Sequence, residues 1–242
     1  MQDRQAVTCA RRPIWFSRIV QFCLALAMMG GAIVAADAQG YQGYRNQRGG
    51  GTPGQFDFYV LALSWSPSFC RSDAGRRNQT QCGMDQRSEF VVHGLWPQYE
   101  RGFPSDCSTV NRSIPRMAMD KAAAIFPDER LARYEWNKHG TCSGLSPSDY
   151  FEDVANARAK VVVPSRFHQP TGDIETSPME IERSFTAANR GLRADMMAVQ
   201  CTRGLMTEIR ICLSKDLRSF VPCQEVNRSS CRAQDITAPA AR

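Results

Sequence analysis

The chain has 242 residues, enough for about one domain with a sizeable core once a removable leader is set aside. Lysine and arginine together number 30 against 24 aspartates and glutamates, a formal net charge of +6 at pH 7. This excess is compatible with a polyanionic substrate, but many secreted proteins carry as much, so composition alone excludes few functions.

The N-terminus has the pattern of a secretory leader. A basic region with four arginines between residues 4 and 18 precedes the apolar run at 22–36, and small residues at 36–38 supply a cleavage site. We therefore predict a signal peptide at 1–38. The apolar run is short for a membrane span, which needs about 20 residues, although an uncleaved anchor is the alternative.

The next segments predict a linker and then one folded domain. Residues 39–54 are rich in Gly, Gln and Arg without an apolar period, which indicates a flexible linker. We place the domain at 55–234 and expect a loose tail at 235–242. Aromatic and β-branched residues predict strands at 56–65 and at 88–97, the second ended by proline.

Helices are predicted in the middle of the chain, where proline or Ser-Pro starts and early acidic residues precede helix formers. The four segments are 114–126, 127–140, 146–162 and 177–193. Residues 205–223 have the pattern of a strand, a turn and a second strand. Strands at both ends with helices between them indicate an α+β fold.

The cysteine count indicates an oxidising compartment. Cys9 and Cys23 fall in the leader, and the remaining eight can form up to four disulfides, with more pairings than the sequence can choose among. A zinc cage is the alternative, but no CxxC pair occurs and the spacings are wide. The eight are Cys70, Cys82, Cys107, Cys142, Cys201, Cys212, Cys223 and Cys231.

Two of the three histidines have glycine and tryptophan close by in the sequence, whereas the third, His168, does not. His93 lies in "FVVHGLWP" and His139 in "YEWNKHGTC". Residues three and four apart share a helix face, so Glu135, Lys138 and His139 are expected together, with Tyr134 one turn before Lys138.

Each feature also has an ordinary explanation. A strand histidine is more often a plain core or surface residue than a catalyst, and Glu135–Lys138 alone is usually a solvated pair. On the strand, Val91 and His93 share one face. Gly94 and Pro97 are expected to turn the backbone beside His93, and Gly140 to end the helix. Because two of the three histidines each have glycine, tryptophan and charged residues in or beside their segments, the two segments together favour acid–base catalysis.

Other chemistries fit the sequence less well. HExxH is absent, and three scattered histidines without an acidic cluster make a poor metal site. There is no GxSxG elbow and no Walker loop. We therefore expect no metal and no cofactor, and a mechanism based on two imidazoles.

These residues resemble a known family. "HGLWP" at 93–97 and "EWNKHGTC" at 135–142 are similar to the two active-site segments of the ribonuclease T2 family. The resemblance extends from residue 56 to about 231 and includes "WSPSFC" and "EIRICLSKDL". It implies a secreted or periplasmic, disulfide-bonded α+β endoribonuclease with an antiparallel sheet core flanked by helices. It also implies an RNA substrate and low base specificity. We further expect a monomer with no membrane attachment after leader cleavage.

The resemblance assigns roles to individual residues. Family members cleave single-stranded RNA by attack of the ribose 2′-hydroxyl on the adjacent phosphorus, through a 2′,3′-cyclic phosphate. His139 matches the general base and His93 the general acid. Glu135 orients its neighbours or holds a proton, and Lys138 offsets charge on the phosphorane. Trp96 matches a residue that stacks on or packs against the nucleotide.

The chain departs from the family pattern in two places. Many members have histidine where this chain has Tyr134, which carries no positive charge near neutral pH. Gln98 and Phe103 stand where adenine-preferring members carry aspartate and tyrosine. Tyr134 supports the alternative of a binding or signalling module with weak or absent RNA cleavage. The family pattern implies the disulfides Cys70–Cys82, Cys107–Cys142, Cys201–Cys231 and Cys212–Cys223.

Overall fold

The structure is a computed structural model that describes residues 50–83, 89–107 and 113–240. The predicted signal peptide at 1–38 and most of the predicted linker lie outside the described residues. No helix within the described ranges is long and apolar enough to cross a membrane.

Six strands and eight α-helices carry the described fold, with three short 3₁₀-helices between them. The strands are β1 (Phe58–Trp65), β2 (Phe90–Gln98), β3 (Ile174–Thr176), β4 (Met197–Thr202), β5 (Leu205–Ser214) and β6 (Ile236–Ala238). The α-helices are α2 (Ser66–Cys70), α3 (Asp73–Arg76), α4 (Gln79–Cys82), α5 (Arg116–Ala123), α6 (Glu129–Lys138), α7 (Pro147–Lys160), α8 (Pro178–Ala188) and α9 (Gln224–Arg228). The 3₁₀-helices are η2 (Gly140–Cys142), η3 (Ser165–Phe167) and η4 (Ala194–Met196).

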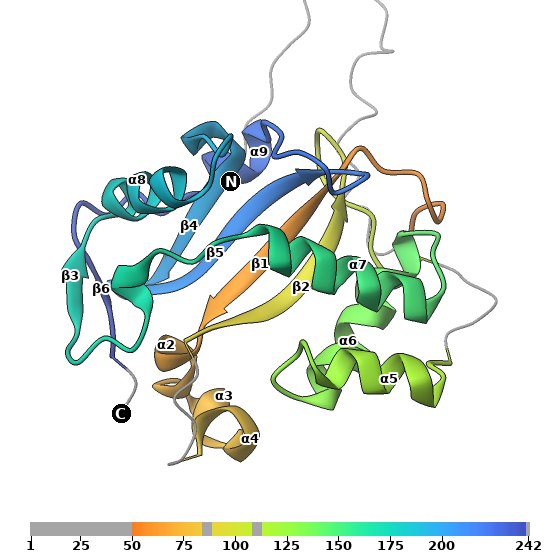
Figure 1. The fold of residues 1–242 in the computed structure, drawn as a ribbon, viewed down its shortest axis with the longest axis horizontal. Helices are drawn as coiled ribbons and strands as arrows, with labels where there is room; N and C mark the ends of the chain where they lie inside the picture. Colours follow the sequence, from red (N-terminus) through yellow and green to blue (C-terminus); the bar gives the residue numbers. More distant parts are fainter. Residues whose placement is uncertain (1–49, 84–88, 108–112, 241–242) are drawn as a thin grey trace, which may run out of the picture. The chain divides into compact units, whose positions relative to one another are not determined.

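The strands form one sheet in the order β2-β1-β5-β6-β3, with β4 also paired to β5. Every pairing is antiparallel except a single parallel bridge between β5 and β6. Helix α7 packs across β1 and β2, α6 contacts β2, and α8 and α9 contact β4 (Figure 1). The predicted α+β fold, an antiparallel sheet flanked by helices, is confirmed.

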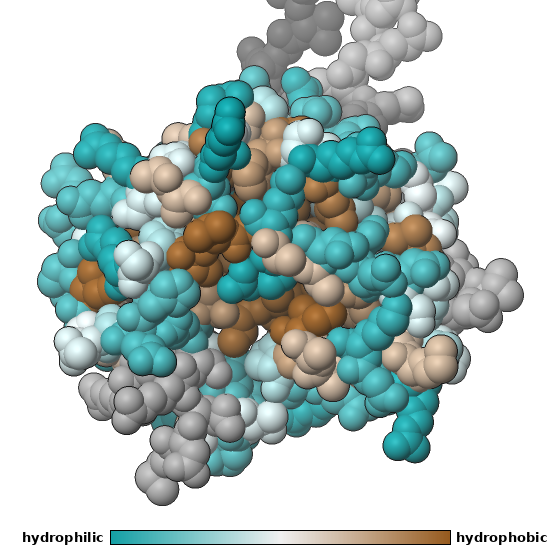
Figure 2. Space-filling model, viewed as in Figure 1, coloured by the Kyte–Doolittle hydropathy of each residue, from teal (hydrophilic) through white to brown (hydrophobic). Residues whose placement is uncertain are grey.

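The two faces of the sheet carry cores of different size. Leu61, Leu95 and Ile211 lie side by side in register and belong to the large core, to which α5 to α8 also contribute. The opposite face has a small cluster of Phe58, Val60, Ala198, Cys212, Cys223 and Val226. The face seen in Figure 2 carries apolar patches interrupted by polar side chains. On the side of the sheet with the small cluster, Val60 and Val226 line a pocket together with polar side chains of the strands, among them His93 and Arg210.

The predicted helices form as α5 to α8, each shorter than expected. Strand β2 continues through Pro97 to Gln98, so the predicted stop at proline is wrong. Because β2 is the edge strand of the sheet, the missing N–H of Pro97 breaks no ladder.

The predicted second strand within 205–223 is also wrong. After β5 only an isolated bridge joins Leu213 and Phe220. Strand β5 already has β1 on one side and β4 on the other, so little free edge is left for a returning strand. Strand β4 was not predicted from the sequence.

The boundaries predicted for the domain need two corrections. The tail expected to be loose contains β6, where Ile236 and Ala238 are buried and pair with β3. Trp65 Nε1 donates to the Pro239 carbonyl at 2.8 Å, which fixes the tail further. At the other end, Gly54 of the predicted linker donates its N–H to the Cys142 carbonyl at 2.9 Å.

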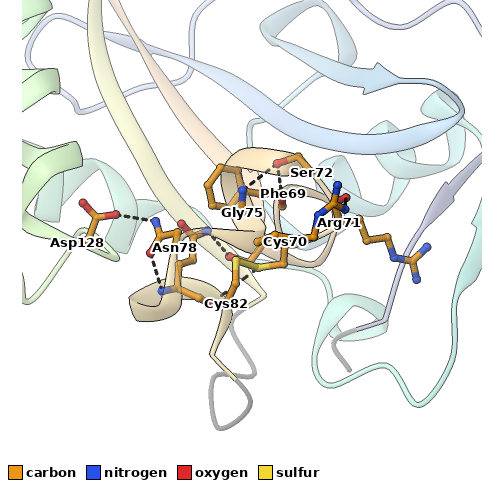
Figure 3. Close-up of a disulfide and its surroundings, with 11 residues drawn as sticks. Phe69, Cys70, Arg71, Ser72, Gly75, Asn78, Cys82 and Asp128 are labelled. Atoms are coloured by element: carbon orange, nitrogen blue, oxygen red, sulfur yellow. Dashed lines mark hydrogen bonds between the residues drawn. A yellow bond between two sulfur atoms is a disulfide. The ribbon is translucent and has the colours of Figure 1, made fainter.

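Four disulfides join the described residues, and they are the four pairs that the family pattern implies. Figure 3 shows Cys70–Cys82, which ties together the short helices α2 to α4. From this segment Asn78 Nδ2 donates to Asp128 Oδ2 at 2.9 Å. Asp128 is the N-cap of α6, so this hydrogen bond links the disulfide-bonded segment to the start of the helix, at the opposite end from Lys138 and His139.

Candidate active site

All eight residues predicted for the site line one pocket of about 370 Å³. They are His93, Trp96, Gln98, Phe103, Tyr134, Glu135, Lys138 and His139. Five more residues from β1, β5 and the region of α9 complete the lining, namely Val60, Arg210, Glu225, Val226 and Ser229. The pocket thus joins segments that are far apart in the sequence.

A β-bulge in strand β2 brings the first motif onto one face. Ala62 of β1 pairs with Gly94 and Leu63 pairs with Val92, so His93 is the extra residue of the bulged strand. Side chains alternate along a regular strand, which would turn residues three apart to opposite faces. The inserted residue shifts this alternation, and His93 and Trp96 therefore open onto the same pocket.

The glycine after each histidine allows a close approach. A Cβ atom on Gly94 would collide with the carboxylate of Glu135 and the indole of Trp96. A Cβ on Gly140 would lie 2.9 Å from a ring carbon of Tyr150. Gly140 lies just past the C-cap of α6, where the helix was predicted to end, but its φ is not positive. Residue 139 is the C-cap of α6 in an αR conformation, and Gly140 begins η2.

His93 is held between two carboxylates. Its Nδ1 lies 2.5 Å from Glu208 Oε2, and its Nε2 lies 3.7 Å from Glu135 Oε1. Arg210 Nε donates to the other oxygen of Glu208 at 2.8 Å. Burial lowers the pKa of His93, but the hydrogen bond to Glu208 and the two carboxylate charges outweigh it, so the pKa lies above its ordinary value.

Glu135 is a buried carboxyl group on the pocket side of α6. It is 1% exposed, and its Oε2 accepts a hydrogen bond from Trp96 Nε1 at 2.7 Å. Burial raises the pKa of Glu135 to about 7, against the lowering effects of His93, Trp96 and Lys138. The group therefore titrates near neutrality, which makes it able to exchange a proton in the pocket.

His139 has the opposite environment to His93. The residue is 6% exposed, and within the described residues its Nδ1 is buried without a hydrogen-bond partner. Burial, and then the positive charges of Lys138 and His93, lower the pKa of His139 to about 3. One pocket thus holds an imidazole that is neutral at pH 7 and another that favours the charged form. Such a pair can accept one proton and give another.

Trp96 lies close to both imidazoles. Its ring centroid is 5.2 Å from that of His93 and 5.2 Å from that of His139. The Arg210 guanidinium lies 5.2 Å from the indole centroid. Much of the indole surface is therefore in contact with protein groups, and its predicted stacking on a nucleotide base stays a prediction.

The rim of the pocket carries exposed aromatic and cationic groups. Tyr134 and Phe103 are about half exposed, whereas Gln98 is buried. Lys138 Nζ donates to the Tyr134 hydroxyl at 2.8 Å, as expected for residues one helical turn apart. The Phe103 ring lies 6.4 Å from that of His139. An exposed ring at this distance from the imidazole offers a flat surface to a planar ligand.

The sequence prediction missed Glu208 and Arg210. Two opposite charges alternating with apolar residues in "EIRIC" place both side chains on one face of a strand, a pattern that could have marked them. Glu225, Val226 and Ser229 offered no comparable pattern, because α9 is one short turn of helix. Within the described ranges, no group of three or more histidine, cysteine, aspartate or glutamate side chains is placed to hold a metal ion.

The fold and the pocket together define a disulfide-bonded α+β protein with acid–base groups gathered at one site. The chain belongs to the Ribonuclease T2 family, whose profile matches residues 56–223. It is 35% identical over 177 residues to a ribonuclease of Aeromonas hydrophila, covering 72% of this chain and 80% of that protein. It is 26% identical over 208 residues to ribonuclease I of Escherichia coli strain K12, covering 67% and 77%. The chain is accordingly a T2-type endoribonuclease.

Solved structures share the fold. An RNase-related protein from Calystegia sepium superimposes with a TM-score of 0.61 at 21% identity, covering 77% of this chain and 98% of that one. RNase NT, solved in complex with 5′-AMP, gives a TM-score of 0.59 at 22% identity, covering 76% and 98%. At these identities the likeness concerns the architecture alone.

Proposed function

We propose that the protein is an exported, metal-independent endoribonuclease that cleaves single-stranded RNA through a 2′,3′-cyclic phosphate, with low base specificity. The observation that carries this proposal is the pair of histidines in one pocket, whose pKa values are displaced in opposite directions. Groups with separated pKa values in a shared site are typical of an acid and a base that act on one substrate.

The first step in this proposal is attack by the ribose 2′-hydroxyl. Neutral His139 takes the proton of the 2′-hydroxyl while the 2′-oxygen forms a bond to phosphorus. The bond from phosphorus to the 5′-oxygen breaks, and protonated His93 gives its proton to that leaving oxygen. The products are a 2′,3′-cyclic phosphate and a free 5′-hydroxyl, with the two histidines in exchanged protonation states. Hydrolysis to the 3′-phosphate reverses the two roles.

The reaction also requires that the negative charge on the phosphorane be stabilised. Lys138 lines the pocket beside His139 and supplies a fixed positive charge for the non-bridging oxygens. Glu135, whose pKa is raised to about 7 by burial, can share a proton with these oxygens while Trp96 keeps its carboxyl group in place. The substrate phosphate also raises the pKa of His139, because a nearby anion favours the imidazolium that proton transfer creates.

The alternative, a binding or signalling module, draws on Tyr134. The Tyr134 hydroxyl is occupied by Lys138 and adds no positive charge where many family members have histidine. Loss of one cation weakens phosphate binding but leaves the acid–base pair intact. Direct detection of the cyclic-phosphate product separates the two functions.

We expect the protein recovered from the periplasm or the medium, with Gln39 as its first residue, to cleave RNA homopolymers in EDTA at an undiminished rate. No step above needs a metal ion. A DNA strand of the same sequence is expected to stay intact, because it lacks the attacking 2′-hydroxyl. The measurement is product analysis by mass spectrometry after incubation with each substrate. Abolition by the chelator, or equal cleavage of DNA, would contradict the mechanism.

The disulfide Cys107–Cys142 is expected to support the site directly. Both cysteines are fully buried, and Cys142 lies in η2 just after His139. Next to Cys107, Asp106 donates its N–H to the Lys138 carbonyl at 2.7 Å. The bond thus ties the loop after β2 to the end of α6.

Changing both Cys107 and Cys142 to serine should lower kcat by about 100-fold, because small misplacements of catalytic groups are costly. The matched control is Cys70→Ser with Cys82→Ser, which removes a disulfide outside the pocket and should leave kcat of the folded protein near the original value. Steady-state kinetics of both variants, each checked by circular dichroism, tests this. Equal turnover in the two folded variants would show that Cys107–Cys142 serves stability alone.

A further inference from the structure

We propose that Glu208 and Arg210 of strand β5 are positioning residues that hold His93 in the orientation and the protonated form needed for its action on the leaving group. This inference rests on the proposed function and deepens it. It concerns a strand far along the chain from both histidine motifs.

The contact at His93 Nδ1 supports this role. A carboxylate oxygen 2.5 Å from His93 Nδ1 can only accept, so the nitrogen must carry a hydrogen. With Nδ1 occupied by Glu208, the nitrogen left to exchange a proton with substrate is Nε2. Glu208 therefore selects the nitrogen that acts and fixes the plane of the ring.

Glu208 is a buried carboxyl group. Its side chain is only 9% exposed, yet both oxygens are used, one by His93 and one by Arg210. Ser64 Oγ of the neighbouring strand lies 3.4 Å from the oxygen that contacts His93. An ionised carboxyl group in such a place costs stability unless its partners are in place, so the arrangement is more specific than a surface ion pair.

Arg210 gives Glu208 its second fixed partner. Its guanidinium is held by the hydrogen bond to Glu208 and by the face of Trp96, 5.2 Å away. Burial raises the pKa of Glu208, but the hydrogen bond and charge of His93, together with the positive charge of Arg210, outweigh it, so the pKa lies below its ordinary value. Glu208 thus stays ionised opposite His93 through the neutral pH range.

The pH dependence follows from all charged groups around His93. Strand β5 presents Glu208 and Arg210, and α6 with its cap presents Glu135, Lys138 and His139, while Glu225 of α9 lines the same pocket. Removing the charge of Glu208 removes a stabilising partner of the imidazolium and lowers the pKa of His93. Because the acid must be protonated to act, the alkaline limb of the activity profile moves to lower pH.

The test is Glu208→Gln, assayed on a ribodinucleoside phosphate as kcat/KM against pH. We expect a loss of about 100-fold at the optimum from a misplaced ring. We also expect the alkaline limb to move down by about one pH unit or more. In the His93→Ala background the same change should cause no further loss, because Glu208 acts through His93.

The chain offers a matched control in its third histidine. His168 Nδ1 lies 3.0 Å from Glu89 Oε2, the same kind of contact but outside the pocket. Glu89→Gln should leave the pH profile unchanged. A Glu208→Gln variant with an unmoved alkaline limb, or with a loss that adds to that of His93→Ala, would overturn the inference.

Two further measurements test the same role of Glu208. If Glu208→Gln does not fold, Glu208→Asp keeps the charge and should keep the alkaline limb near its original position. Nuclear magnetic resonance of the unaltered protein should find His93 titrating above the ordinary histidine range, and a value at or below that range would contradict the proposal. Full activity of His93→Ala would instead refute the proposed function itself.

Discussion

Replacing His139 by alanine is expected to lower kcat/KM for RNA by about 10²- to 10⁴-fold, the rate contribution typical of a positioned general base. His139 is buried beside the pocket, and its pKa of about 3 leaves the ring neutral and able to accept a proton at neutral pH. Because the neutral form persists down to that value, the acid limb of kcat/KM should lie below the ordinary histidine range. The measurement is the pH profile of kcat/KM for the unaltered protein and for the variant.

His168→Ala is the control for this substitution. His168 is exposed and paired with Glu89, and it does not line the pocket. It should keep the original rate and profile. A folded His139→Ala variant with near-original activity would refute the role of His139 as the base.

Replacing His93 by alanine is expected to cause a loss of similar size, about 10²- to 10⁴-fold, for a different reason. The 5′-oxygen is a poor leaving group unless it gains a proton as the bond breaks, and His93 is the ring whose surroundings favour the protonated form. Since Glu208 and Glu135 raise the pKa of this ring, activity should persist above the ordinary histidine range in the unaltered protein. In the variant, the alkaline limb due to His93 should vanish.

His93→Asn tests whether the loss is one of chemistry or of shape. Asparagine keeps a side chain that can hydrogen-bond Glu208 but does not titrate in this range. It should be as inactive as alanine. Recovery of most of the rate with asparagine would show that His93 acts by packing or hydrogen bonding alone.

The sequence sufficed for features that depend on near neighbours. Glu135, Lys138 and His139 share a pocket because residues three and four apart on α6 face the same way, a property of any helix. The helices α5 to α8 follow from local start and stop residues in the same way.

Features that depend on distant pairing could not be predicted. The bulge at His93 is defined by how β2 pairs with β1, which the sequence of β2 alone does not determine. This pairing turns His93 and Trp96 to the same face of the sheet. Glu208 reaches His93 because β5 lies on the other side of β1. The docked tail at β6 depends likewise on an edge supplied by β3.

The assignment of His139 as the general base and His93 as the general acid is tested most directly by changing the leaving group. A ribonucleoside 3′-(4-nitrophenyl phosphate) has a leaving group that departs without protonation but needs the same 2′-attack. The rate of each alanine variant, relative to the unaltered protein, is measured on this ester and on a ribodinucleoside phosphate. His93→Ala should recover most of its activity on the ester, whereas His139→Ala should stay impaired on both. Equal impairment of the two variants on the ester, or recovery by His139→Ala instead, would contradict the assignment.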